Sequence, residues 1–297
     1  MSFDPASFLS ELQPWASQAG GELTLRGRRG GAGHTTLHFV HGNSFCAGIY
    51  WPLLQKLARD YRLFCHDLEG HGSSDLPPRH RGPAYDAARI KAVIDEQQLT
   101  QQRPLIGFGH SYGAALTIKL AAANPTLFDA LVLIDPILIP RSLWWGIRLF
   151  GRFGLNPIQA GAQRRRTHWP DAAAVAKHLK GRGIYAGWTD EAFACFVAHG
   201  TRDSDDGQRT LCCPSWIEAA NFGDPVYVWN ALPQIRCPVL LIHGDASYPF
   251  IAPAAQRAQR LCPQIELEIQ RGGHCFMQED PADTAQRIAA FLKRHGH

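Results

Sequence analysis

The five residues Gly109-His110-Ser111-Tyr112-Gly113 constrain the fold of this chain more than any other stretch. A short apolar run, 104–108, precedes them, and an Ala- and Leu-rich segment, 112–123, follows and stops at Asn124-Pro125. This order predicts a buried strand that turns sharply into a helix. The glycines leave room for a strained turn that holds the Ser111 hydroxyl exposed at the carboxyl end of the strand. Ser111 is therefore a candidate nucleophile.

Short apolar strands alternate with helical segments along much of the chain. Strands are expected at 21–29, 36–40, 61–66, 104–108, 130–134, 238–243 and 265–269, and helices at 50–59, 84–98, 112–123, 253–261 and from 280 to about 294. Residues 1–20 read as a weakly amphipathic start. The alternation predicts an α/β fold with a mostly parallel sheet, helices on both faces, and active groups at the carboxyl ends of the strands.

The strand–helix rhythm breaks between Ile137 and Leu232. This stretch contains several tryptophans and many arginines, helical patterns at 171–179 and 190–198, and no clear strand. It predicts a mainly helical lid inserted into the α/β core. The expected organisation is a first part of the core at 1–136, the lid at 137–232 and a second part of the core at 233–297.

Composition excludes several classes of function. With 45% hydrophobic and 19% charged residues and a net charge of +4 spread thinly, the chain is globular and not suited to nucleic acid. The basic run Arg164-Arg165-Arg166 is interpreted as a solvated face rather than a membrane patch. The start lacks a signal-peptide pattern, so a cytoplasmic protein with no membrane partner is expected. The eight cysteines are scattered and read as reduced thiols, and no metal or cofactor is expected.

Four motifs occur in the order found in one large family of enzymes. They are His41-Gly42-Asn43, Asp67-x-x-Gly70-x-Gly72-x-Ser74, the turn at Ser111, and Gly273-His274, each after its own predicted strand. With these motifs the chain resembles the α/β-hydrolase fold superfamily, in the branch with a serine nucleophile and a helical lid. The resemblance covers nearly the whole chain and is weakest over the lid.

The resemblance implies a site in which His274 takes the proton of Ser111 as the serine attacks a carbonyl carbon. Backbone N–H groups of Tyr112 and Asn43 would stabilise the resulting oxyanion. Candidate residues of the substrate pocket are His41, Phe45, Trp144 and Cys275, although His41 is also a candidate hydrogen-bonding partner of the oxyanion loop. The tryptophans at 144, 145, 169, 188, 216 and 229 belong to or flank the lid, and one or two of them could face the serine.

The acid that orients His274 departs from the usual pattern. The family commonly carries it in a Gly-x-x-Asp arrangement, but Gly244-Asp245-Ala246-Ser247 has serine at that position. Asp135, at the end of the strand after the Ser111 helix, is favoured, and Asp245 is the alternative. The one that does not orient the histidine is expected to cap a helix or stabilise a turn.

Three functions fit these residues. The leading one is a cofactor-independent serine hydrolase, carboxylesterase-like, that cleaves a carboxylic ester or related acyl bond of a small apolar substrate through an acyl-enzyme. The second is different chemistry at the same serine, either hydrolysis of a C–C bond or a lyase reaction. The third is a catalytically silent ligand-binding protein. The sequence does not indicate an oligomeric state.

Overall fold

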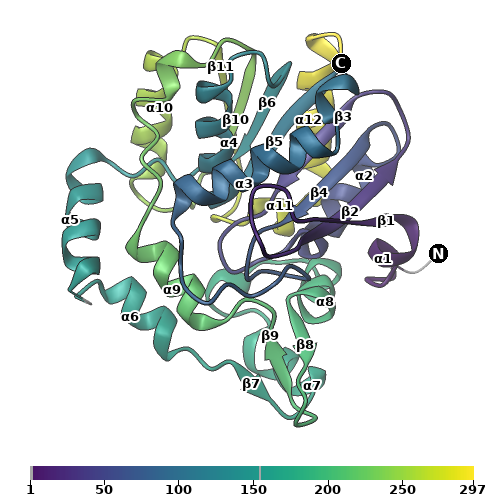
Figure 1. The fold of residues 1–297 in the computed structure, drawn as a ribbon, viewed down its shortest axis with the longest axis vertical. Coiled ribbons are helices and arrows are strands. Elements are labelled where there is room, and N and C mark those ends of the chain that lie inside the picture. Colours follow the sequence, from purple (N-terminus) through teal and green to yellow (C-terminus); the bar gives the residue numbers. More distant parts are fainter. Residues whose placement is uncertain (1–2, 154) are drawn as a thin grey trace.

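The computed structural model describes residues 3–153 and 155–297 and contains a mixed sheet of eight strands in the order β1-β2-β4-β3-β5-β6-β10-β11 (Figure 1). The strands are β1 Gln13–Ser17, β2 Leu25–Gly31, β3 Thr36–Val40, β4 Arg62–Asp67, β5 Leu105–His110, β6 Ala130–Ile134, β10 Val239–Gly244 and β11 Ile265–Gln270. In this sheet the β1–β2 and β2–β4 pairs are antiparallel, and the other pairs are parallel. The prediction of a mostly parallel α/β sheet is confirmed.

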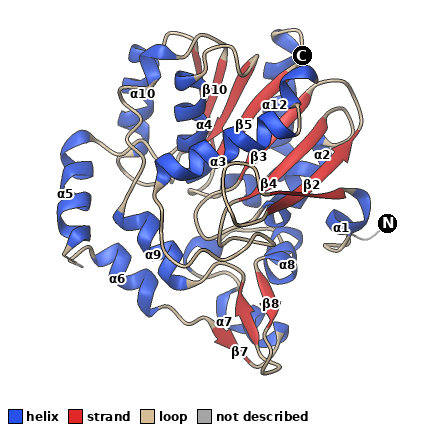
Figure 2. Ribbon diagram, viewed as in Figure 1, coloured by secondary structure: helices blue, strands red, loops and turns tan. Residues whose placement is uncertain are grey.

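Helices cover both faces of this sheet (Figure 2). They are α1 Ser7–Glu11, α2 Trp51–Leu57, α3 Pro83–Glu96, α4 Tyr112–Ala123, α10 Ile251–Leu261, α11 Phe276–Glu279 and α12 Pro281–Arg294, with the 3-10 turns η1 Ala47–Tyr50, η2 Leu99–Gln101 and η4 Leu232–Gln234. One buried cluster joins the sheet to α2, α11 and α12, and a second joins it to α3, α4 and α10. Burial on both faces explains why the central strands are continuous apolar runs rather than alternating ones.

The segment between β6 and β10 contains α5 Arg141–Arg152, α6 Pro157–Arg164, η3 Gly183–Tyr185, α7 Ala172–Leu179, α8 Asp190–His199 and α9 Ser215–Gly223. Phe193 and Phe196 of α8 pack into the core cluster on the α2 side. Helices α5 and α6 instead lie at the periphery, with α9 beside them (Figure 1). Within this segment, α8 is therefore anchored on the core, whereas α5 and α6 are not.

Two expectations about secondary structure are wrong. The stretch 137–232 was expected to lack strands, but β7 His168–Trp169, β8 Thr201–Asp203 and β9 Arg209–Leu211 form a three-stranded antiparallel sheet. Strand β1 was also missed, in a stretch expected to be weakly amphipathic. The strands of the small sheet have two or three residues each, which is too short for an alternating pattern to be read. No helix in the described part of the chain is long and apolar enough to cross a membrane.

The sheet register brings three chain segments together at the carboxyl ends of the central strands. His110 pairs with Ile134 in the β5–β6 ladder, and Ile134 pairs with Ile242 in the β6–β10 ladder. The residues that follow these positions, among them Ser111 and Asp135, therefore leave the sheet side by side. The loop after β11 carries His274 to the same strand ends.

Candidate active site

Ser111 occupies a strained turn between β5 and α4, with φ 53° and ψ −113°. Two neighbouring glycines make the turn possible. A Cβ on Gly113 would lie 2.2 Å from the carbonyl oxygen of Val40, and one on Gly109 would lie 2.6 Å from the backbone nitrogen of Ala114. Since real Cβ atoms do not approach backbone atoms this closely, only glycine allows α4 to start directly against β3 and β5. The turn places Ser111 at the helix N-terminus, where the serine lines a cavity.

The side chains of Ser111, His274 and Asp135 form one chain of hydrogen bonds. The Nε2 atom of His274 lies 2.9 Å from Oγ of Ser111, and its Nδ1 atom lies 2.6 Å from Oδ2 of Asp135. A carboxylate only accepts, so Nδ1 carries the hydrogen and Nε2 is left with a lone pair that faces the serine hydroxyl. This tautomer is the one that can take a proton from Ser111.

Asp135 is fully buried, and both of its carboxylate oxygens accept hydrogen bonds. Gly244 donates its backbone N–H to Oδ1 at 2.9 Å, and the Ser247 hydroxyl donates to Oδ2 at 2.5 Å. Ser247 is the serine that stands where the family commonly has the acid. Asp245 instead accepts the backbone N–H of Gly272 at 2.9 Å, and among the described residues no hydrogen bond joins it to His274. The structure therefore brings Asp135, and not Asp245, to the histidine.

Two backbone N–H groups, one in the loop after β3 and one at the start of α4, belong to residues that line the same cavity as Ser111. The N–H of Asn43 has no acceptor among the described residues, and that of Tyr112 is at the first turn of α4, where a helix supplies none. Asn43 is held through its side chain, which donates to the carbonyl of Glu218 at 3.1 Å and accepts from Asn221 at 2.8 Å. The Tyr112 hydroxyl donates to Asp86 at 2.7 Å. Both residues line the cavity next to the serine.

A buried hydrogen-bond relay joins the Asn43 loop to the His274 loop. The backbone N–H of Gly42 donates to the Tyr50 hydroxyl at 3.0 Å, this hydroxyl lies 2.7 Å from Nδ1 of His110, and Nε2 of His110 lies 3.0 Å from the carbonyl oxygen of His274. Because a carbonyl only accepts, Nε2 carries the hydrogen and Nδ1 accepts from Tyr50. Burial, and then the nearby His274, hold the pKa of His110 well below 6.5, so its ring stays neutral.

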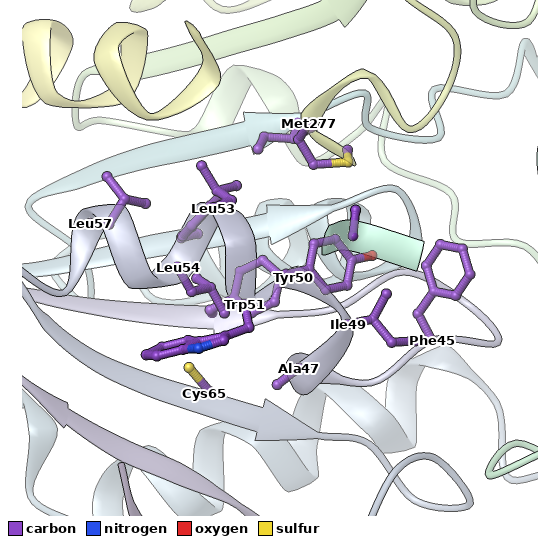
Figure 3. Close-up of a cluster of buried hydrophobic side chains, with 14 of the residues drawn as sticks. Phe45, Ala47, Ile49, Tyr50, Trp51, Leu53, Leu54, Leu57, Cys65 and Met277 are labelled. Atoms are coloured by element: carbon purple, nitrogen blue, oxygen red, sulfur yellow. The ribbon is translucent and has the colours of Figure 1, made fainter. Parts of the chain in front are cut away.

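Replacement of Tyr50 by phenylalanine should lower kcat and leave KM nearly unchanged. Tyr50 is fully buried in the core cluster with Phe45 and Met277 (Figure 3), so the change would leave both Gly42 N–H and His110 Nδ1 without a partner. We expect a loss of roughly tenfold in kcat, together with about 1–3 kcal/mol in the free energy of unfolding. Steady-state kinetics and urea unfolding measure the two effects.

Tyr61→Phe is the matched control for this relay. Tyr61 is also buried, but its hydroxyl has no partner in the described part of the chain. It should change neither kcat nor KM. If Tyr50→Phe lost stability but kept the kcat of the unaltered protein, the relay would support folding only.

Ser111 opens into a cavity of about 610 Å³ with mostly apolar walls. The walls come from the Asn43 loop, α4, α5, the start of α6, α9 and the loop after β10. The lining side chains include Phe45, Leu143, Ile147, Phe150, Tyr185, Phe222, Tyr248 and Phe250. The one arginine among the described lining residues, Arg165, pairs with Glu218 at 2.6 Å. The cavity therefore has room for an apolar group and no unpaired arginine.

Three of the four expected pocket residues do not line this cavity. Phe45 does. His41 is fully buried, accepts the N–H of Leu68 at 3.0 Å and lies 2.8 Å from the carbonyl of Gly42, and burial lowers its pKa to about 4. Trp144 is not among the lining residues, and its indole N–H donates to the carbonyl of Pro225 at 2.8 Å. Cys275 is enclosed in the core. These three support the walls instead of forming them.

No tryptophan is among the described residues that line the cavity, so none of them forms the apolar wall that one or two could have supplied. The aromatic wall that sequence reasoning missed comes from Phe150, Tyr185 and Tyr248. The Tyr248 ring lies 4.9 Å from the ring of His274. On α5 a signal was present, because Leu143, Ile147 and Phe150 recur at helical spacing. The sequence contains no such signal for Tyr248, because this residue lies in a loop whose path the sequence does not specify.

Two comparisons with known proteins cover nearly the whole chain. A 2-(acetamidomethylene)succinate hydrolase of Mesorhizobium japonicum is 26% identical over 275 residues, which cover 92% of each chain. The crystal structure of an E-2-(acetamidomethylene)succinate hydrolase superimposes with a TM-score of 0.75 and 25% identity, over 95% of this chain and 99% of that one.

A thioesterase domain from the curacin biosynthetic pathway has the same fold, with a TM-score of 0.75 at 21% identity over 94% of this chain and 99% of that one. A model of the alpha/beta hydrolase family matches residues 39–287, which include the four motifs and the edge of the sheet where Ser111, Asp135 and His274 meet. The chain therefore belongs to the alpha/beta hydrolase family.

Proposed function

We propose that this protein is a cofactor-independent serine hydrolase that cleaves a carboxylic ester or a related acyl bond of a small apolar substrate. The observation that carries the proposal is the continuous hydrogen-bond chain from Ser111 through His274 to the buried Asp135. The hydrolases with which the chain shares its family and fold support the same reaction class.

In the proposed mechanism, Oγ of Ser111 attacks the carbonyl carbon of the substrate while its proton passes to Nε2 of His274. Asp135 stabilises the imidazolium that forms. The oxyanion accepts hydrogen bonds from the backbone N–H groups of Asn43 and Tyr112. His274 then gives the proton to the leaving oxygen, which departs and leaves an acyl group on Ser111. Water activated by His274 releases the acid and restores the serine.

The cavity walls favour an uncharged acyl or aryl group. The aromatic and aliphatic side chains that line the cavity stabilise a bound group that buries apolar surface against them. A dicarboxylate would need a cation to pair with, and Arg165 is already engaged by Glu218. We therefore expect this chain to prefer a neutral ester to one with a succinate group, the group named in the relative's substrate.

Pre-steady-state hydrolysis of p-nitrophenyl butyrate tests the proposal. We expect a burst of p-nitrophenol equimolar with the enzyme, a butyryl adduct in the intact-protein mass during the steady state, and a lower kcat/KM for the p-nitrophenyl ester of succinic acid. A lyase or a silent binding protein would form no acyl-enzyme. Turnover without an adduct or a burst, even under rapid quenching, would move the assignment to chemistry that does not pass through acyl-Ser111.

A further inference from the structure

Helix α5 has two apolar ridges that point in different directions. Leu143, Ile147 and Phe150 recur at helical spacing and line the cavity. Trp145, Leu149 and Phe153 recur every fourth residue, which also places them on one side of the helix. These three do not line the cavity, and 58%, 57% and 67% of their respective surfaces are exposed. Trp145 makes an edge-on contact with the ring of Trp144, with 4.9 Å between the ring centroids, but more than half of each side chain in the outer ridge is open to solvent.

The outer ridge continues into the start of α6. Leu155 and Ile158 are 66% and 58% exposed, and Phe150 is 52% exposed. We call the set Trp145, Leu149, Phe150, Phe153, Leu155 and Ile158 the outer apolar face. Soluble proteins rarely leave large apolar side chains exposed side by side unless they contact a partner. In Figure 1, α5 and α6 lie at the edge of the molecule, away from the sheet.

The charged residues of the chain segment that carries this face are all arginines. Residues 136–170 contain six arginines, at 141, 148, 152, 164, 165 and 166, and no aspartate or glutamate. Arg148 pairs with Asp224 and Arg165 with Glu218, both from outside this stretch. Arg141 and Arg164 are exposed and have no acidic partner among the described residues. A cationic border around exposed apolar and aromatic side chains is the composition of a helix that lies in the headgroup region of an anionic membrane.

The outer apolar face is continuous with the mouth of the cavity. Leu143, Phe150, Leu155 and Ile158 are exposed on the surface and also line the cavity that ends at Ser111. An apolar molecule that leaves a membrane at this face would thus meet apolar side chains from the surface to the serine. A second copy of the chain is a poorer occupant, because a two-fold contact would bring the same arginines face to face.

We propose that the outer apolar face docks on the surface of an anionic phospholipid membrane, with Trp145, Leu149 and Phe153 inserted among the lipids and Arg141 and Arg164 beside the phosphates. This interpretation replaces the expectation of a merely solvated basic run with no membrane partner. Docking there needs no spanning helix. Membrane docking goes beyond the proposed hydrolase function and does not depend on the chemistry of Ser111.

Flotation with vesicles tests the docking. The full chain should float with phosphatidylcholine vesicles that contain phosphatidylglycerol, less with phosphatidylcholine alone, and less as ionic strength rises. The triple variant Trp145→Ser, Leu149→Ser, Phe153→Ser should bind at least about tenfold more weakly. Arg141→Gln and Arg164→Gln should each weaken binding by roughly fivefold. The triple variant should keep its kcat/KM for a soluble short-chain ester, because none of its three positions lines the cavity.

The matched control is the triple variant Leu9→Ser, Leu76→Ser, Leu261→Ser. It removes three leucines outside the outer apolar face, whose surfaces are 48%, 49% and 36% exposed, respectively. It should float like the unaltered protein, and so should Ser111→Ala, which separates docking from catalysis. Absence of flotation with the anionic vesicles would overturn the proposal, as would an equal loss in the matched variant. A dimer in solution that the Trp145 triple variant dissociates would also overturn it and assign the face to a second copy.

Discussion

Replacement of Ser111 by alanine should reduce kcat for a short-chain p-nitrophenyl ester by about 10⁶-fold, to the level of the oxyanion site acting alone. The change removes Oγ, the atom that lies 2.9 Å from Nε2 of His274, from the cavity that Asn43 and Tyr112 also line. Alanine is smaller than serine and takes the same turn, so the melting temperature should stay close to that of the unaltered protein.

Ser142→Ala is the control for this change. Ser142 also lines the cavity, but it lies on α5, and among the described residues no hydrogen bond joins it to His274. It should turn over the ester at the rate of the unaltered protein. If Ser111→Ala retained more than about a hundredth of the activity, after removal of any contaminating esterase, the nucleophile would be another group and the proposed mechanism would be wrong.

Asp135→Asn should lower kcat by about 10⁴-fold, equivalent to roughly 5.5 kcal/mol of transition-state stabilisation. Asparagine fits the space, but it brings an N–H₂ group among Nδ1 of His274, the Ser247 hydroxyl and the Gly244 N–H, all of which donate to Asp135. The imidazolium loses its counter-charge. The histidine is also pushed toward the tautomer with hydrogen on Nε2, which cannot accept the serine proton. Steady-state kinetics measure the loss.

Asp245→Asn is the matched comparison, since it makes the same chemical change two positions from Ser247. Asp245 accepts only the Gly272 N–H among the described residues, and asparagine can accept that bond through its carbonyl oxygen. We expect a loss of less than about threefold in kcat. Equal losses at both positions would mean that neither carboxylate orients His274. A larger loss at 245 would make Asp245 the acid.

The sheet was largely readable from the sequence because its central strands are buried on both faces. Such strands are continuous apolar runs bounded by turn residues, as at 130–134 and 239–244. The small sheet of β7, β8 and β9 could not be read, because the pairing of strands this short depends on tertiary contacts rather than on a pattern. The edge strand β1 was missed for the related reason that its exposed residues blur the alternation.

The positions of the site residues were predictable where a motif fixes the backbone. They were unpredictable where they depend on the path of a loop or on packing between helices. Ser111 follows β5 directly and His274 follows β11 after a short loop, so the strand order placed both at the carboxyl ends of the strands. The choice between Asp135 and Asp245 depended on the path of the loop after β10, which turns Asp245 to Gly272 and brings the Ser247 hydroxyl to Asp135. Among the expected pocket residues, Phe45 lines the cavity, whereas the placement of Trp144 depended on helix packing. Trp144 and Phe150 occupy one helix, and only the packing of α5 against its neighbours determines which of them faces the cavity.

The central claim is that His274 and Asp135 activate the hydroxyl of Ser111, and its most direct test needs no substrate. Intact-protein mass is measured after incubation with a fluorophosphonate, for the unaltered protein and for Ser111→Ala in parallel. The account predicts a single covalent adduct on the unaltered protein, located at Ser111 by peptide mapping, and none on the variant. No adduct on the folded, unaltered protein, or the same adduct on both, would contradict it.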